Sequence, residues 1–539
     1  MMKYMCAFIL LFFVLAVPCW SDDQKFYDDD PIVKEDDPQD ASGAKPYDIN
    51  LIYDFLENLF TMPGDPTMNV RAQNINAIDE VPDSNWYENR TGLSPEAVAK
   101  GPDTSDGPAP GKWTVTGAKS NGVTPGFTIK DSTGQRWFIK FDPPDYPGMA
   151  TGTEVVVTKL FWSLGYHVPE NHLSTLTVEN LTVGDGAKIT PPSGKKRPMK
   201  ISDINKLLLL AAKNEDGSYR VIASKALPGK PLGGFRFYGT RPDDPNDVFP
   251  HEHRRELRGY GVFAAWLNHV DSKSINSLDT MIEENGKSHV RHFLLDFGAT
   301  LGSASLTPHE EWEGYEYLYE GHRQVGRDAI GVGFHVEPWR RVKYYDARSI
   351  GRFQQEYENW DPDSWKAREP NPAFLRSRAD DKFWAARKLM GLTDDMIRAA
   401  IKTGEFNDPE SEEFIVNALI QRRNAIGRKY LTAINPIVDP ALDSSGVLTF
   451  GNAAAAAGFA TVPAEYQATW YRFDNSSGQT TLIGETSGSS ERLEPPANLP
   501  AESGAFVKIE ISLKDGAPVH AYFHRTSGGW KLVGFERMP

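Results

Sequence analysis

Two short segments carry side chains whose types and spacing fit phosphoryl transfer. The first, NHVDSKSINSLD, contains Asp271, Lys273 and Asn276, and the second, HFLLDFG, places Asp296 after an apolar run. Phosphoryl transfer needs a carboxylate that holds the acceptor hydroxyl, and an asparagine and a second carboxylate that bind the metal neutralising the phosphates. Asp271, Asn276 and Asp296 would supply these three groups.

A β-hairpin is expected to bring the two segments together. Between them, SLDTMIEENGKSHVRHFLL predicts a strand, a turn at Asn285-Gly286 and a second strand. Paired strands would place Asn276 beside Asp296. At average residue usage, the pattern His-x-Asp-x-Lys-x-x-Asn occurs by chance in roughly one chain per thousand. We therefore interpret it as a site, although Asp271 in a polar run is also compatible with a helix cap or a turn.

The sequence before these segments has β periodicity. WTVTG, GFTIKD and RWFIKF are short β-type runs separated by turns, and they predict an antiparallel sheet. An apolar helix predicted over 153–164 follows and ends at Gly165. This part contains Lys140 and Glu154, which taken alone are typical of an exposed strand lysine and a glutamate at a helix start.

The polar loop and the Asp-Phe-Gly resemble those of the protein-kinase-like superfamily. The preceding sheet resembles the small lobe of the HipA toxin kinases and of atypical secreted kinases. This resemblance implies a two-lobed α+β fold over 111–435, with a β-rich lobe at 111–230 and a helical lobe at 231–435. It also implies that ATP, with Mg²⁺ or Mn²⁺, binds between the lobes.

The resemblance gives each residue of the polar loop and the Asp-Phe-Gly a role. Asp271 resembles the catalytic base, and Lys273 resembles a contact to the γ-phosphate. Asn276 and Asp296 resemble the metal ligands. His269 resembles a structural brace.

The small-lobe residues are matched in the same way. Lys140 resembles the lysine that contacts ATP, and Glu154 resembles its ion-pair partner. VTGAKSNGVTPGFTIKD resembles the hairpin that covers the phosphates, with Gly117, Gly122 and Gly126 in its turn region. The glycines do not spell G-x-G-x-x-G, and no Ala-Pro-Glu follows Asp-Phe-Gly. These departures argue against activation-loop phosphorylation and against an ordinary groove for peptide substrates.

Charge and the N-terminal segment limit the function classes. The 539 residues include 58 Lys+Arg and 73 Asp+Glu, and this acidic balance argues against nucleic-acid binding. Residues 1–21, with an apolar run at 7–17, are typical of a signal peptide and too short for a comfortable membrane span. We expect an exported protein, periplasmic, extracellular or in a secretory lumen, without a stable membrane span after cleavage. Its cysteines, Cys6 and Cys19, would be lost.

Two further regions flank the kinase-like part. Residues 22–110 predict a flexible acidic leader and a helical extension, and 446–539 predict a separate all-β domain in which Val507, Ile509 and Ile511 alternate with polar residues. The extension includes an amphipathic helix with one apolar face, and we expect this helix to pack on a larger body. That face comprises Leu51, Ile52, Phe55, Leu56, Leu59 and Phe60.

The combined prediction is an exported atypical kinase that transfers the γ-phosphoryl group of ATP to an unidentified protein, glycan or small-molecule acceptor. Two alternatives stay open. A catalytically inactive kinase-like scaffold would be favoured by a cleft that side chains block. Nucleotidyl transfer on the same fold would use the same residues with a different orientation of the nucleotide.

Overall fold

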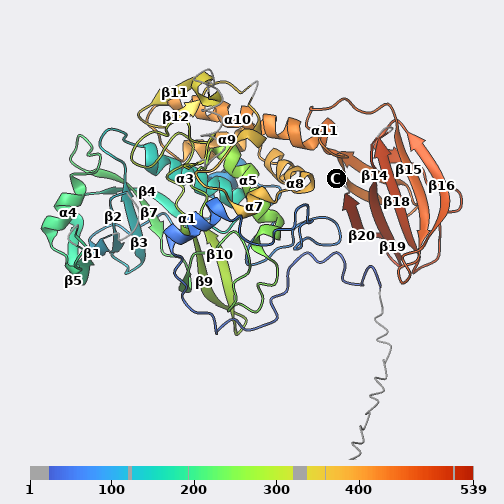
Figure 1. Ribbon diagram of the computed structural model, residues 1–539, viewed down its shortest axis with the longest axis horizontal. Coiled ribbons are helices and arrows are strands. Elements are labelled where there is room, and N and C mark those ends of the chain that lie inside the picture. The colour runs from blue at the N-terminus through green and yellow to red at the C-terminus, as the bar shows by residue number, and fades with distance from the viewer. Residues whose placement is uncertain are drawn as a thin grey trace, which may run out of the picture.

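The computed structural model describes residues 24–118, 124–191, 194–319, 337–357, 360–513 and 516–537, so the predicted signal peptide lies outside the described residues. Three parts follow one another along the long axis of the molecule: a sheet with few helices, a mainly helical body, and a second β region (Figure 1). The fold is therefore mixed α+β. Within the described ranges, no helix is both long and apolar enough to cross a membrane.

The first part is a seven-stranded sheet with the strand order β4-β7-β3-β2-β1-β5-β6. The predicted antiparallel arrangement of the first three strands is confirmed, and β1 also pairs with β5 in parallel. Its strands are β1 Trp113–Ala118, β2 Gly126–Lys130, β3 Arg136–Phe141, β4 Asn171–Leu176, β5 Leu181–Ile189, β6 Arg197–Pro198 and β7 Tyr219–Lys225.

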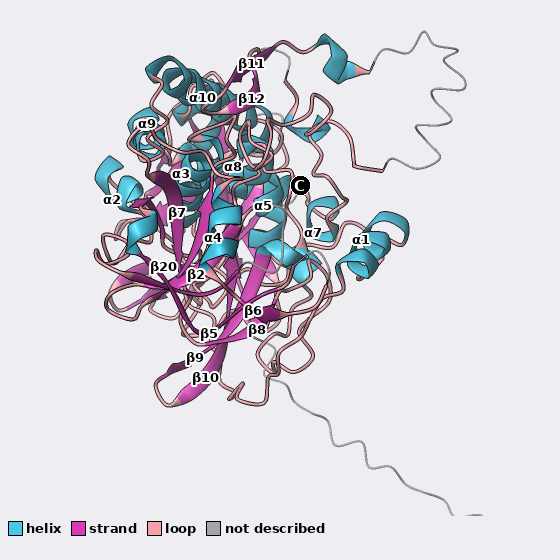
Figure 2. Cartoon of the chain, turned by 90° about the vertical axis from the view of Figure 1, so that its left-hand side faces the viewer, coloured by secondary structure: helices cyan, strands magenta, loops and turns pink. Residues whose placement is uncertain are grey.

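Strand alternation separates the two faces of this sheet. Trp137, Ile139 and Phe141 of β3 are buried in a core with helix α4 (Ile201–Leu208), which lies over this face in Figure 2. Successive side chains of a strand point to opposite faces, so Lys140 points to the other face. There it meets helix α3 (Met149–Ser163), whose apolar side chains enter the core of the helical body.

Helix α3 begins earlier than the sequence predicts. Asp142, which lies outside the helix, accepts hydrogen bonds from the backbone N–H groups of Gly148 (2.9 Å) and Thr151 (2.9 Å). This carboxylate caps the first turn of α3. Sequence patterns for helix capping consider only the residues next to the helix start, so they do not identify Asp142. The end agrees with the prediction, because Gly165 follows the last turn with φ +104°.

The helical body also contains a small three-stranded sheet, β10-β9-β8. The predicted hairpin is confirmed by the pairing of β9 with β10, and its turn residues Asn285 and Gly286 have φ values of 52° and 78°. The body comprises α2 Pro95–Lys100, β8 Lys230–Gly233, α5 Arg255–Leu267, β9 Ser277–Glu284, β10 Lys287–Leu294, β11 Tyr344–Ala347, β12 Gly351–Gln354, α7 Pro372–Leu375, α8 Ala379–Met390, α9 Asp394–Lys402 and α10 Pro409–Leu431.

The C-terminal β region consists of two sheets that share one core. The predicted alternation is confirmed, because Val507, Ile509 and Ile511 are buried. The region starts before the predicted boundary and includes one helical turn. Its elements are β13 Ile437–Leu442, β14 Leu448–Asn452, α11 Ala453–Ala456, β15 Tyr466–Phe473, β16 Thr480–Gly488, β17 Arg492–Leu493, β18 Phe506–Leu513, β19 Val519–Thr526 and β20 Gly529–Arg537.

The predicted flexible leader is wrong for its described part. The Phe26 ring is buried against Tyr522 of the C-terminal sheet, with ring centroids 4.9 Å apart. The Phe26 N–H donates to Asn475 (2.9 Å), and the Ala41 N–H donates to the Ser288 carbonyl in the body (2.9 Å). The segment thus runs from the C-terminal sheet to the body, as the blue ribbon in Figure 1 shows.

The predicted amphipathic helix is present and lies on the body, but its polar side is buried and most of its apolar side is exposed. In α1 (Leu51–Phe60) the polar Asp54 and Asn58 are buried, at 3% and 6% exposure, whereas Ile52 is 74% exposed and Phe60 63% exposed. Hydrophobic periodicity identifies the two faces of a helix but does not show which face has partners. Here the body offers polar partners.

Buried arginines at the start of α5 join the N-terminal segment to the helical body. The guanidinium of Arg255 is fully buried and contacts Asp79 (2.8 Å), Asp380 (2.9 Å) and Asp381 (3.1 Å). Asp79 belongs to the N-terminal segment and the other two carboxylates belong to α8. One side chain therefore connects three elements.

Replacing Arg255 with alanine should lower the free energy of unfolding by about 3–5 kcal/mol, because three buried carboxylates would each lose one of their arginine partners. Urea denaturation measures this difference. Lys343→Ala is the matched control, because the ion pair of Lys343 with Glu356 is exposed (70% and 65%) and its loss should leave the free energy of unfolding nearly unchanged. A loss below about 1 kcal/mol for Arg255→Ala would contradict this account.

Candidate active site

Lys140 connects the sheet to two carboxylates. Its Nζ lies 2.8 Å from both carboxylate oxygens of Glu154 and 2.9 Å from Oδ1 of Asp296. Burial alone would lower the pKa of Lys140, but the charges of Asp296 and Glu154 raise the pKa above its ordinary value. The lysine is therefore a permanent cation, and the structure brings together three of the predicted residues.

The Asp-Phe-Gly segment is held by its other two residues. Phe297 is fully buried, and its ring packs against Phe161 of α3 with centroids 5.0 Å apart. Gly298 lies so close to Glu154 that an added Cβ would be 3.2 Å from the glutamate Oε2. Asp296 itself has φ +58°, a left-handed conformation that non-glycine residues rarely adopt. The backbone thus turns the aspartate toward Lys140.

The polar loop follows α5 and forms a compact network. The amide nitrogen of Asn276 donates to the Asp271 carboxylate (2.8 Å) and carbonyl (2.7 Å), and Lys273 Nζ lies 2.7 Å from Asp271 Oδ1. Burial favours a higher pKa for Asp271, but the charges of Lys273 and Arg368 hold the pKa below its ordinary value. Asp271 is therefore ionised at neutral pH.

The hairpin places the two segments side by side, as predicted. The Leu295 N–H donates to the carbonyl of Asn276 (2.9 Å), which extends the β9–β10 pairing by one step. This hydrogen bond lies between the last residue of the polar loop and the residue before Asp296.

His269 lies below the loop in the aromatic core. Its Nδ1 is 2.7 Å from the Thr300 hydroxyl, and its ring centroid is 5.7 Å from that of Phe297. Burial lowers the pKa of His269 to about 4, so the imidazole is neutral. This placement agrees with the predicted brace.

Two cavities meet at Asp296. The first, of about 640 Å³, is lined by Lys140, Glu154 and Asp296 together with residues of β1, β2, β3 and β5. The second, of about 900 Å³, is lined by Asp271, Lys273, Asn276 and Asp296. The predicted residues are thus divided between two cavities that share one carboxylate.

The glycine predictions have three different outcomes. Gly117 lines the first cavity. Gly126 pairs with Lys140 across β2 and β3 but is not part of the cavity wall. Gly122 lies outside the described residues.

The sequence did not reveal the other cations of the first cavity. Its wall includes Arg136, Lys188, Lys196 and Lys225. Lys188 lies opposite Gly117 in the parallel β1–β5 pair, a long-range pairing that local periodicity does not reveal. Cations therefore predominate on this wall, which suits a polyanionic ligand.

The side-chain oxygens of Asn276 and Asp296 are donors that fit a magnesium-like cation. Because the Asn276 amide nitrogen faces Asp271, its carbonyl oxygen is the atom that remains to bind a metal beside Asp296. Mg²⁺ is usually held by one or two carboxylates together with substrate phosphates. Among the described residues there is no cluster of three or more His, Cys, Asp or Glu side chains that could hold a metal alone.

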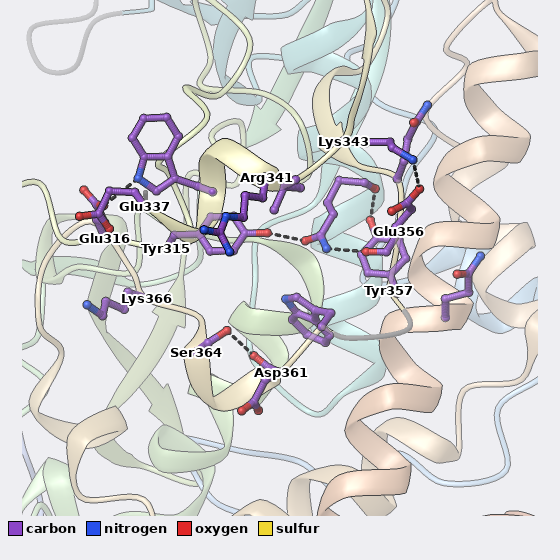
Figure 3. Close-up of a pocket in the computed structure, with 16 residues that line it drawn as sticks. Tyr315, Glu316, Glu337, Arg341, Lys343, Glu356, Tyr357, Asp361, Ser364 and Lys366 are labelled. Atoms are coloured by element: carbon purple, nitrogen blue, oxygen red, sulfur yellow. Dashed lines mark hydrogen bonds and ion pairs between the residues drawn. The ribbon is translucent and has the colours of Figure 1, made fainter. Parts of the chain in front are cut away.

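A third cavity, of about 1140 Å³, contains none of the predicted site residues. Its side chains bond mainly to one another, as Figure 3 shows. The Tyr315 hydroxyl donates to Gln354 (2.6 Å), and Lys343 pairs with Glu356 (2.7 Å). This cavity is therefore not a candidate for the phosphoryl-transfer chemistry.

Glu369, which lines the second cavity, should make stability depend on pH. Burial raises the pKa of Glu369 to about 7 from the ordinary 4.5. Because the folded protein binds this proton more tightly, the free energy of unfolding should fall as the pH rises from about 4.5 to about 7. Urea denaturation gives the free energy of unfolding of the wild type and of Glu369→Gln. The difference, variant minus wild type, should be about 2 kcal/mol larger at pH 8 than at pH 5, because only the wild type loses stability when Glu369 ionises. The same gain at both pH values would contradict this assignment.

No family model matches the sequence, and no curated protein matches it. Among solved structures, the crystal structure of a proinflammatory kinase of Helicobacter pylori, CtkA, is similar to part of the chain. The match covers 58% of this chain and 93% of that chain, with 11% sequence identity and a TM-score of 0.30. The candidate site therefore rests on the geometry of its own residues.

Proposed function

We propose that this chain is an exported ATP-dependent phosphotransferase with a two-lobed, protein-kinase-like catalytic domain. One observation carries the proposal: Lys140 is held between Glu154 and Asp296 at the point where a cation-lined cavity meets the cavity of Asp271. This arrangement supports phosphoryl transfer, because it offers one cavity for a nucleotide and an adjoining cavity for an acceptor. Export is proposed from residues 1–21 alone.

In this proposal the first cavity takes the nucleotide. Lys140, fixed by two carboxylates, would bind the phosphates, and Lys188 and Lys196 would add positive charge at the cavity wall. Asn276 and Asp296 would hold Mg²⁺ or Mn²⁺, which would neutralise charge on the phosphates when bound.

Asp271 would act on the acceptor. Its lowered pKa keeps the carboxylate ionised, and the hydrogen bonds from Asn276 fix its orientation. The acceptor hydroxyl would donate to this carboxylate while its oxygen forms a bond to the γ-phosphorus. The bond from that phosphorus to the β–γ bridging oxygen breaks, ADP leaves, and the hydroxyl proton passes to Asp271.

The open first cavity supports catalysis over the inactive scaffold, for which a blocked cleft was expected. Nucleotidyl transfer would use the same residues. The mass added to the product distinguishes the two reactions, since a phosphoryl group and a nucleotidyl group differ in mass.

Asp271→Asn and Asp296→Asn should each lower turnover of γ-labelled ATP by about 10²–10⁴-fold, because they remove the base and a metal ligand. Radiolabel release or transfer measures the rate. Asp395→Asn is the control, because Asp395 is exposed at the start of α9 and lines neither cavity. Unchanged turnover in both site variants would refute the assignment.

Lys196→Glu should raise the KM for ATP about tenfold, because it reverses a charge at the wall of the proposed nucleotide cavity. Lys195→Glu gives a matched control, since Lys195 is also exposed but is not part of that wall. Steady-state kinetics over a range of ATP concentrations separates the two. Equal increases in KM for both variants would show that the effect is only one of overall charge.

A further inference from the structure

Helix α1 forms one wall of the cavity that contains Asp271. Leu51, Ile52 and Phe55 line this cavity, and α1 contacts the 3-10 turn Ser274–Asn276 at the end of the polar loop. These are apolar side chains of the N-terminal extension, far in sequence from the residues of the proposed chemistry. The acceptor side of the site is therefore built partly from outside the kinase-like region.

The orientation of α1 is fixed by its polar face. Asp54 pairs with Arg236 (3.4 Å), and the amide nitrogen of Asn58 donates to Glu369 (3.3 Å). On the same side of the helix, Glu57 accepts a hydrogen bond from the Tyr238 hydroxyl (2.6 Å). With the polar side chains bound to the body, the helix cannot turn its apolar face inward without leaving buried charges unpaired.

The apolar wall continues beyond the cavity. Leu56 and Phe60 are exposed on α1, and the Phe60 ring lies 6.3 Å from that of Tyr319, which is also exposed. Exposed apolar side chains that adjoin one another mark binding surfaces more often than isolated ones do. Ile52, Leu56 and Phe60 recur at four-residue spacing, so the strip runs for about 12 Å along the helix, which corresponds to about four residues of an extended chain.

The charges of the cavity argue against an anionic acceptor. Besides Asp271 and Asp296, four acidic residues line it, namely Asp54, Glu310, Glu313 and Glu369, of which Glu369 is partly protonated at neutral pH because burial raises its pKa to about 7. Its basic residues are Lys273 and Arg368, which lie beside acids: Lys273 next to Asp271, and Arg368 Nε 2.5 Å from Glu313. A phosphorylated metabolite or an acidic lipid headgroup would be repelled here.

We propose that α1 is a specificity element of the acceptor site and that the acceptor is a polypeptide hydroxyl flanked by an apolar side chain. This inference rests on the proposed phosphotransferase function and names its substrate class. The apolar neighbour of the hydroxyl residue packs on Leu51, Ile52 and Phe55 while the hydroxyl reaches Asp271. An acceptor held by the N-terminal extension also fits a chain without the Ala-Pro-Glu of an ordinary substrate groove.

A peptide array tests this proposal with the full chain as enzyme. The peptides carry a central Ser, Thr or Tyr, and each flanking position is fixed in turn as one amino acid; transfer from γ-labelled ATP is measured. We expect a preference for Leu, Ile, Val or Phe at one flanking position. Ile52→Ser should lower kcat/KM for the preferred peptide roughly tenfold, as expected for the loss of one apolar contact.

Tyr53→Ser is the matched control, because Tyr53 is exposed on α1 but does not line the cavity. This variant should keep the preference. The dissociation constant for ATP, measured in parallel, separates the two proposals: ATP binding without peptide labelling overturns the polypeptide acceptor alone, whereas no ATP binding overturns both. Labelling without an apolar preference, or a preference that Ile52→Ser leaves intact, also overturns the role of α1.

Discussion

The ion contacts of Lys140 are the constraint on which the rest of the site depends. One ammonium group joins β3 to the start of α3 and to the end of the β9–β10 hairpin. Because it is nearly buried, the lysine depends on these carboxylates to balance its charge, and removing one of them would leave the other as its remaining partner of the two. The surrounding structure keeps these groups in place: Asp142 fixes the start of α3, and Phe297 fixes the segment that carries Asp296. A permanent cation between two cavities is the result.

The parts of the site that the sequence predicted depend on local patterns. The Asn285-Gly286 turn and the alternation around it predicted the hairpin that brings Asn276 to Asp296. The residues of the site that the sequence did not predict are positioned by partners that are distant in the chain. Lys188 enters the first cavity through a parallel pair with β1, and Asp54 is buried because Arg236 lies opposite it. No local sequence pattern identifies either of these pairings.

The N-terminal segment shows the same limit. Its acidic composition predicted flexibility, yet Phe26 is buried in the C-terminal sheet and Asp79 pairs with Arg255 in the body. Composition averages over a tract, whereas a few well-placed side chains are enough to order it. The segment therefore connects the C-terminal β region, the helical body and α1, and through α1 it reaches the proposed acceptor site.

The most direct test of the central claim is nucleotide binding, measured as the melting temperature of the purified protein with ATP, with and without Mg²⁺. At 100 times the dissociation constant, bound ATP should stabilise the fold by about 2.7 kcal/mol. We predict a metal-dependent rise in the melting temperature of the wild type that Asp296→Ala abolishes. No rise with ATP, or an equal rise in Asp296→Ala, would contradict a catalytic cleft organised by Lys140, Glu154 and Asp296.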